Sequence, residues 1–266
     1  MGGGSWMKVL FAAGIAAVCL SGVAQAQTCQ SYVGQTITPK TFEQAIAGFG
    51  NVAPKGEFET TAQYQARIAA GGTGGPLFIS KKPEDTKYFQ YDADNQVLNI
   101  QSYALHNTNM GWWEAFYEAK PAGLKASTAS NIAVVISQTD KPGGTYSAQN
   151  SYGASTTVTR IARTSYGIFE RDSLSDWVIW QNSKSGHLGS IPMDIATAQQ
   201  VKQTLKVAFV VVPKAPYLVQ GTHSVGKTTI SNPTDITETF KIMIADIQCG
   251  LVTDGTNKVL GGYAVK

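Results

Sequence analysis

The sequence has 266 residues, of which 21 are Lys or Arg and 18 are Asp or Glu, and its formal net charge at pH 7 is +3. Hydrophobic residues make up 43% of the chain and charged residues 15%, a balance that excludes an intrinsically disordered protein. The chain lacks the excess of basic residues that is typical of nucleic-acid-binding domains, so we expect no nucleic-acid partner.

The N-terminal segment has the three parts of a secretory signal peptide. Lys8 supplies a positive charge, residues 9–23 form an apolar run, and residues 24–26 (Ala-Gln-Ala) match a small-residue cleavage site. The run is shorter than the about 20 apolar residues that a membrane-spanning helix needs. We therefore expect a natural start at Met7, cleavage after Ala26, and a mature chain in the periplasm or outside the cell that has no transmembrane segment. An uncleaved membrane anchor is the alternative.

Two of the three cysteines stay in the mature chain, because Cys19 lies inside the signal peptide. Cys29 and Cys249 remain, and an oxidising compartment favours one disulfide between them. In the chain-entropy description, a bond that closes so long a loop stabilises the folded chain by roughly 4 to 5 kcal/mol. Two unpaired thiols are the alternative interpretation.

Three segments are predicted to be helices. Residues 41–49 repeat apolar side chains at the spacing of one helix face. Residues 60–70 begin with a capping box formed by Thr60 and Gln63. Residues 194–205 form the third helix.

Between the first two helices, residues 55–60 read Lys-Gly-Glu-Phe-Glu-Thr. With the tyrosine and arginine that follow, the segment resembles a KGEFET-x-x-x-Tyr-x-x-Arg pattern of exported bacterial envelope proteins of unknown function. The resemblance covers a small part of the chain, implies an envelope location and carries no catalytic residue with it. We expect a structural role in which Phe58 docks on the core and Arg67 pairs with Glu57 or Glu59.

Most of the remaining chain is typical of strands. Residues 87–91 and 96–103 alternate around a polar turn at residues 92–95, which predicts a hairpin. Residues 125–130 and 141–155 are rich in Ser, Thr and Gly and predict long loops. Further strands are predicted at residues 132–138, 156–162, 177–181, 206–212, 238–249 and 259–264.

The order of these elements predicts the fold class. Strands outnumber helices and do not alternate with them regularly, which indicates an α+β fold: a β-rich, antiparallel sandwich-like sheet with about three to four helices. We expect residues 27–266 to form a single exported domain. A sub-boundary near residues 121–130 is the alternative, and the disulfide would then join the two halves.

The most distinctive candidate for a binding surface is aromatic. Trp112, Trp113, Phe116 and Tyr117 lie at helical spacing, and Trp177 could join them from a strand. One interpretation is an amphipathic helix that packs its aromatic stripe on the sheet. The other is an aromatic platform for a protein, a glycan or a lipid surface of the envelope.

Sequence patterns for catalysis are weak. Residues 221–228 match the phosphate-loop pattern GxxxxGK[ST], but the β-branched residues and Pro233 that follow cannot form the helix that such a loop needs, so we predict a strand-turn-strand. The three histidines, His106, His187 and His223, lack the spacing of a metal site. We expect no cofactor and no metal.

The sequence therefore favours a binding function over catalysis. We expect an exported binding or interaction module of the cell envelope in preference to an enzyme. A hydrolase acting on envelope material and a structural component of a surface assembly are the alternatives. A pocket with convergent polar groups would favour the hydrolase, and a long unpaired strand edge would favour assembly.

Overall fold

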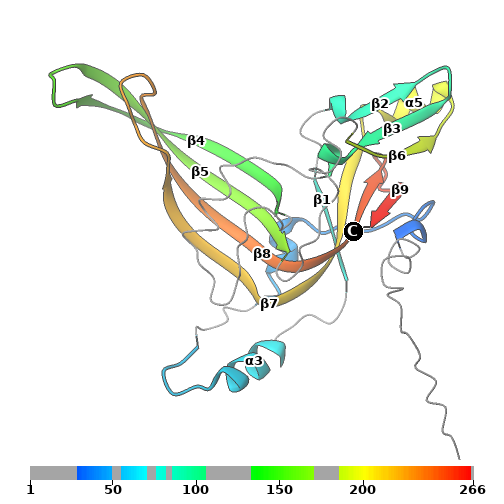
Figure 1. Ribbon diagram of the computed structural model, residues 1–266, viewed down its shortest axis with the longest axis horizontal. Helices are drawn as coiled ribbons and strands as arrows, with labels where there is room; N and C mark the ends of the chain where they lie inside the picture. Colours follow the sequence, from blue (N-terminus) through cyan, green and yellow to red (C-terminus); the bar gives the residue numbers. More distant parts are fainter. Residues whose placement is uncertain are drawn as a thin grey trace, which may run out of the picture.

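The computed structural model describes residues 29–49, 55–70, 76–81, 86–105, 133–170 and 186–264. Within these ranges, six strands form a larger sheet with the order β1-β7-β8-β5-β4, in which β9 also pairs with β8, and three strands form a smaller sheet with the order β2-β3-β6 (Figure 1). The strands are β1 (Leu77–Lys81), β2 (Phe89–Asp92), β3 (Val97–Gln101), β4 (Ala133–Gln149), β5 (Ser155–Glu170), β6 (His187–Pro192), β7 (Lys206–Val225), β8 (Thr234–Thr253) and β9 (Val259–Ala264). The helices are α2 (Phe42–Ile46), α3 (Thr61–Ala70) and α5 (Ile195–Val201), with short 3-10 turns at η1 (Thr86–Tyr88) and η2 (Ser102–Ala104).

The three predicted helices are confirmed, and side chains cap each of them. Thr41 and Gln44 form a reciprocal capping box at α2, and Thr60 and Gln63 form the predicted box at α3. Asp194 accepts the backbone N–H of the third residue of α5, which lowers the pKa of its carboxyl. None of the described helices has the length and apolarity required to cross a membrane.

The KGEFET segment forms a turn ahead of α3. Glu59 binds Arg67 through two hydrogen bonds of 2.8 and 2.9 Å, which confirms one of the two predicted ion pairs and lowers the pKa of Glu59 to about 2. The prediction that Phe58 docks on the core is wrong, because 93% of its surface is exposed. Glu59 closes the turn on Gly56 with its backbone N–H, and this turn presents the phenyl ring to solvent.

The predicted hairpin at residues 87–103 is confirmed as β2 and β3. Asp92 holds its turn by accepting the side-chain amide N–H of Asn95 and the backbone N–H groups of Asn95 and Asp94, which lowers the pKa of the Asp92 carboxyl. The smaller sheet is completed by β6, which the sequence did not indicate as a strand.

The larger sheet is confirmed as β-rich, but it is mixed instead of antiparallel throughout, because β5 runs parallel to β8. Its strands are much longer than predicted. Residues 141–155 are not a long loop: β4 continues to Gln149, and the turn occupies only residues 150–154. Two glycines, Gly143 and Gly144, fall where the β4–β5 register shifts, and that irregularity keeps both strands paired.

The core lies on both faces of the inner parts of β7 and β8. On one face, Phe209 and Met243 join Ile100 and Ile191 of the smaller sheet and Phe42 of α2 in the main hydrophobic cluster. On the other face, a second cluster contains Ala208, Val210, Leu251, Val259 and both disulfide-bonded cysteines. These strand segments are therefore buried on both sides.

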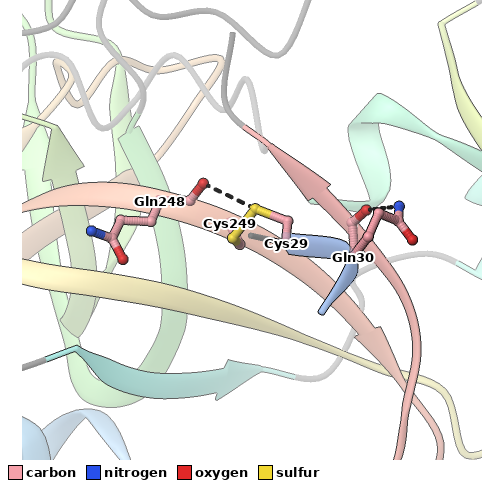
Figure 2. The surroundings of a disulfide bond; sticks show 5 residues. Cys29, Gln30, Gln248 and Cys249 are labelled. Carbon is pink, nitrogen blue, oxygen red and sulfur yellow. Dashed lines mark hydrogen bonds between the residues drawn. A yellow bond between two sulfur atoms is a disulfide. The ribbon is translucent and has the colours of Figure 1, made fainter. Parts of the chain in front are cut away.

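The predicted disulfide joins Cys29 to Cys249, with 5.6 Å between the two Cα atoms (Figure 2). Both cysteines are buried, and the bond attaches the start of the described chain to β8. Beside it, Gln30 donates its side-chain N–H to the carbonyl of Gly262 at 2.7 Å. A Cβ on Gly262 would lie 2.3 Å from the Cys29 carbonyl oxygen, so only glycine fits at this position in β9.

Residues 29–40, which we call the strap, cover two strand edges after the disulfide. The backbone N–H of Gly34 donates to Val259, and that of Val259 donates to Gln35, so the strap pairs with the outer edge of β9. Further along, the N–H of Lys40 donates to the carbonyl of Phe78 in β1. The strap therefore covers backbone groups at both places that would otherwise attract another strand.

Candidate functional site: a polar belt and a projecting arm

The larger sheet changes character along its four longest strands. In β7 and β8 the inner segments are buried, whereas the segments that lead to the turn at residues 226–233 are mostly half-buried or exposed, and the turn itself is almost entirely exposed. The β4–β5 hairpin changes in the same way. We call residues 139–164 and 224–237, all of which the structure describes, the arm; Val158 is its one buried residue. Figure 1 shows the arm projecting away from the smaller sheet.

Four polar side chains, one from each long strand, meet where the arm begins. Ser165 donates its hydroxyl proton to Oε1 of Glu238, and Nε2 of His223 lies 2.7 Å from Oε2 of the same carboxylate. Gln138 donates its side-chain N–H to the Ser165 hydroxyl at 3.1 Å and to Oε1 of Glu238 at 3.5 Å. We call Gln138, Ser165, His223 and Glu238 the polar belt.

The belt is buried across most of its width. Ser165 has no exposed surface, and His223 and Glu238 are 5% and 3% exposed, while Gln138 closes the belt at the exposed edge strand β4. Within the strand pairs, His223 lies opposite Glu238 and Gln138 opposite Ser165. Because one carboxylate accepts from three neighbouring strands, the belt joins the strands laterally where hydrophobic contacts give way to solvent.

The belt contains the residue types of a catalytic triad, Ser, His and Glu, but the order of their contacts differs from that of a triad. In a catalytic triad the histidine contacts the serine and the acid orients the histidine. Here Glu238 lies between Ser165 and His223, and the serine hydroxyl donates to the carboxylate. The serine is also fully buried, so a substrate could not reach it. The belt is therefore structural.

A second Ser–His contact lies on the smaller sheet. The exposed Ser190 hydroxyl is 3.3 Å from Nε2 of His187, but it donates its proton to Oδ1 of Asn99 at 2.6 Å. The proton therefore points away from the imidazole that would have to remove it. Among the described residues, no three His, Cys, Asp or Glu side chains gather in a group that could hold a metal ion.

Beyond the belt, the arm is held by polar contacts between its strands. Arg163 binds Asp140 through two hydrogen bonds of 2.7 and 2.8 Å, and this contact lowers the pKa of the Asp140 carboxyl. The Arg160 guanidinium lies 4.5 Å from the centre of the Tyr146 ring, and the Tyr146 hydroxyl donates to Asp235 at 3.3 Å. Each contact bridges two strands, so the arm keeps its shape with little apolar burial.

The outer edge of β4 has features that discourage pairing with another chain. Its register with β5 shifts twice, near Ile136 and between Pro142 and Thr145. Pro142 has no N–H to donate, and Lys141 places a charge beside it. Proline, lysine and bulges are the means by which natural edge strands avoid aggregation. The long regular edge that would favour a surface assembly does not occur along β4.

Several predicted site residues lie outside the described residues. The five aromatic residues Trp112, Trp113, Phe116, Tyr117 and Trp177 are all among them. The same holds for His106 and for the sub-boundary at residues 121–130. Residues 221–228 form the end of β7 and the beginning of its turn, so the predicted strand-turn-strand is confirmed.

The belt and the ends of the arm were not predicted as a site. One signal for the belt was present in the sequence. Glu238 is a charged residue in a strand that buries alternate positions, and it is in phase with the buried Phe240 and Ile242. His223 lies opposite it, a pairing that the sequence alone does not reveal. No family model matches this chain, and neither the curated proteins nor the solved structures include a significant match.

Proposed function

We propose that this chain is an exported binding module of the cell envelope and that the arm is its binding element. The observation that carries the proposal is the arm itself, in which four strands continue past the core, with their residues mostly exposed. The disulfide supports an oxidising compartment, and the N-terminal signal pattern supports export.

Stability alone does not account for the arm. Burial of apolar surface is the main favourable term in folding, and the arm buries one side chain, Val158. A two-stranded ribbon in water is marginally stable by itself. Yet Asp140, Arg163 and the belt hold the arm in a defined shape. A projection that contributes little to stability and still keeps a fixed shape is suited to contact with a partner.

The geometry gives the two alternatives less support. A serine hydrolase needs a hydroxyl whose proton faces a base, and both Ser–His neighbourhoods of the described chain direct the serine proton to another acceptor. An assembly built by strand addition needs a regular free edge, which the two shifts in β4 interrupt.

Shortening the arm tests the proposal. Replacing residues 148–156 with Asn-Gly joins Ser147 to Thr157, which already lie opposite each other, by a favourable two-residue turn. We expect the shortened protein to keep its circular dichroism spectrum and to lose its association with the envelope fraction of the producing cell. The Phe58→Ser variant, which removes an exposed aromatic outside the arm, is the matched control. Undiminished association of a folded, shortened protein would contradict the proposal.

A further inference from the structure

The two ends of the arm lie at the same end of the larger sheet. Because β5 runs parallel to β8, the turn that precedes each strand lies on the same side, as Figure 1 shows. The N–H of Thr159 donates to the carbonyl of Pro233 at 2.9 Å and joins the two hairpins directly. We call residues 150–154 and 226–233 the tip loops.

Each tip loop presents one large apolar side chain to solvent. Tyr152 is 95% exposed and Ile230 is 42% exposed. The other tip-loop side chains are small, uncharged and polar, apart from Ala154, Pro233 and the exposed Lys227. Two amphipathic or apolar side chains therefore lie at the outermost points of a polar arm.

Internal hydrogen bonds hold the tip loops in shape. Oδ1 of Asn150 accepts the backbone N–H groups of Tyr152 and Ala154, each at 3.0 Å. In the other loop, the N–H of Thr229 donates to the carbonyl of Asn232, and the N–H of Asn232 donates back to the Thr229 hydroxyl. Backbone groups that are already paired can enter an interface of low polarity without a large desolvation cost.

The end of the arm has one sign of charge. Residues 141–162 and 224–234 contain three cations and no Asp or Glu, in a chain that elsewhere has equal numbers of basic and acidic residues. The cations are Lys141, Arg160 and Lys227, and all three are exposed. The adjoining acids are occupied, since Asp140 binds Arg163 and the partly buried Asp235 accepts the Tyr146 hydroxyl.

We propose that the tip loops dock on the surface of a bilayer that contains anionic phospholipids. Lys227 meets the lipid phosphates, the Tyr152 ring lies at the headgroup level, and Ile230 enters the edge of the hydrocarbon, while Lys141 and Arg160 add positive charge along the arm behind the tips. This inference rests on the proposed function and names the partner of the arm. An anionic surface with an apolar layer beneath it matches both the charge and the exposed side chains of the tips.

So few contacts predict weak, reversible binding. We expect an association constant no greater than that of a single myristoyl chain, roughly 10⁴ M⁻¹. Binding should fall as salt rises, because exposed charges are screened over about 10 Å at 0.1 M ionic strength.

The test measures sedimentation of the purified, disulfide-bonded protein with vesicles of phosphatidylglycerol and phosphatidylethanolamine, and with phosphatidylcholine vesicles for comparison. We expect binding to the anionic vesicles only. The Tyr152→Ser/Ile230→Ser double variant should bind roughly tenfold more weakly, and Lys227→Gln should reduce the salt dependence. Phe58→Ser is the control, because it removes an equally exposed aromatic from another region. All these positions are exposed, so every variant should fold.

Equal binding to neutral and anionic vesicles would overturn the inference, and so would undiminished binding of the double variant. If no vesicle binds while the shortened arm still loses its association with the envelope fraction, the lipid assignment is wrong and the proposed function stands, with a protein or a glycan as the partner. If the double variant still binds the vesicles and the shortened protein still associates with the envelope fraction, both the lipid assignment and the proposed function are wrong.

Discussion

The inner and outer halves of β8 differ in how deeply their side chains are buried. From Ile242 to Ala245, successive residues are buried on alternating faces, while Thr237 and Thr239 in the outer half are exposed. The inner half is held by apolar contacts on both sides and by the disulfide. The outer half is held by the buried carboxylate of Glu238 and by the hydrogen bond that Tyr146 of β4 donates to Asp235.

This difference shows that a strand can continue well past its core when neighbouring hairpins supply the pairing. The backbone pairing of β7 with β8 extends from Lys206 to Val225, but only the inner part of this length is buried. Threonine and other β-branched residues favour the extended backbone where burial no longer does. The comparison predicts that the two halves respond very differently to mutation.

Removal of the disulfide is expected to have the largest effect, and to affect the inner half. The Cys29→Ser/Cys249→Ser variant loses a bond that spans 220 residues of sequence, which should lower the free energy of unfolding by about 5 kcal/mol. Urea unfolding followed by circular dichroism measures the change. The shortened arm is the matched comparison and should unfold within about 1 kcal/mol of the wild type. Equal losses in the two variants would contradict the division into two halves.

Loss of the belt carboxylate is expected to have an intermediate effect. In Glu238→Ala, the buried Ser165 hydroxyl and His223 ring lose the acceptor that they share, which should cost about 3 kcal/mol. Urea unfolding gives the free energy, and hydrogen exchange of the arm amides should show faster opening in that region.

The neighbouring Thr239→Ala is the control for the belt variant. Thr239 lies on the exposed face of the same strand, where its hydroxyl is 3.3 Å from that of Thr222, so its loss should change stability by less than about 1 kcal/mol. A Glu238→Ala protein as stable as this control would show that the belt does not hold the strands together.

The ion pair within the arm is expected to have the smallest effect, and one that depends on pH. Arg163 lowers the pKa of Asp140 below its ordinary value of 3.8. A folded-state pKa below the unfolded value stabilises the protein above that ordinary value, and the contribution is lost as pH falls through the lowered pKa. Because Asp140 is 42% exposed, solvent screening limits the contribution to less than about 1 kcal/mol.

Asp140→Asn should therefore be slightly less stable than the wild type at about pH 7, and the difference should be smaller at about pH 2. Denaturant unfolding at both values measures the difference. A loss that is undiminished at low pH would assign the effect to packing instead of charge.

Local patterns in the sequence predicted much of the fold. The capping residues Thr60 and Asp194 act on backbone groups within three positions, so helix starts could be read directly. The turn at Asp92 is equally local. The length of β4 could not be read, because Gly143 and Gly144 indicate a loop unless β5 is present to pair with the residues on both sides.

The candidate site was less accessible to sequence reasoning. Glu238 is unusual among the buried positions of its strand, but its partners Ser165 and His223 come from strands 73 and 15 residues away. The sequence did not indicate the tip loops as a binding surface. Tyr152 and Ile230 form one only because two turns lie at the same end of the sheet. Parallel pairing of β5 with β8 brings them there.

The sequence by itself determined the covalent and local features: the pairing of two remaining cysteines, the helix caps, the first hairpin and the failure of residues 221–228 to form a phosphate loop. These depend on neighbouring residues or on the count of one residue type. Only the tertiary structure decided that β5 lies parallel to β8, that a carboxylate joins four strands, and that the strands extend into an arm. Such features depend on contacts between distant segments, whose register is set by the summed burial and pairing of the whole sheet.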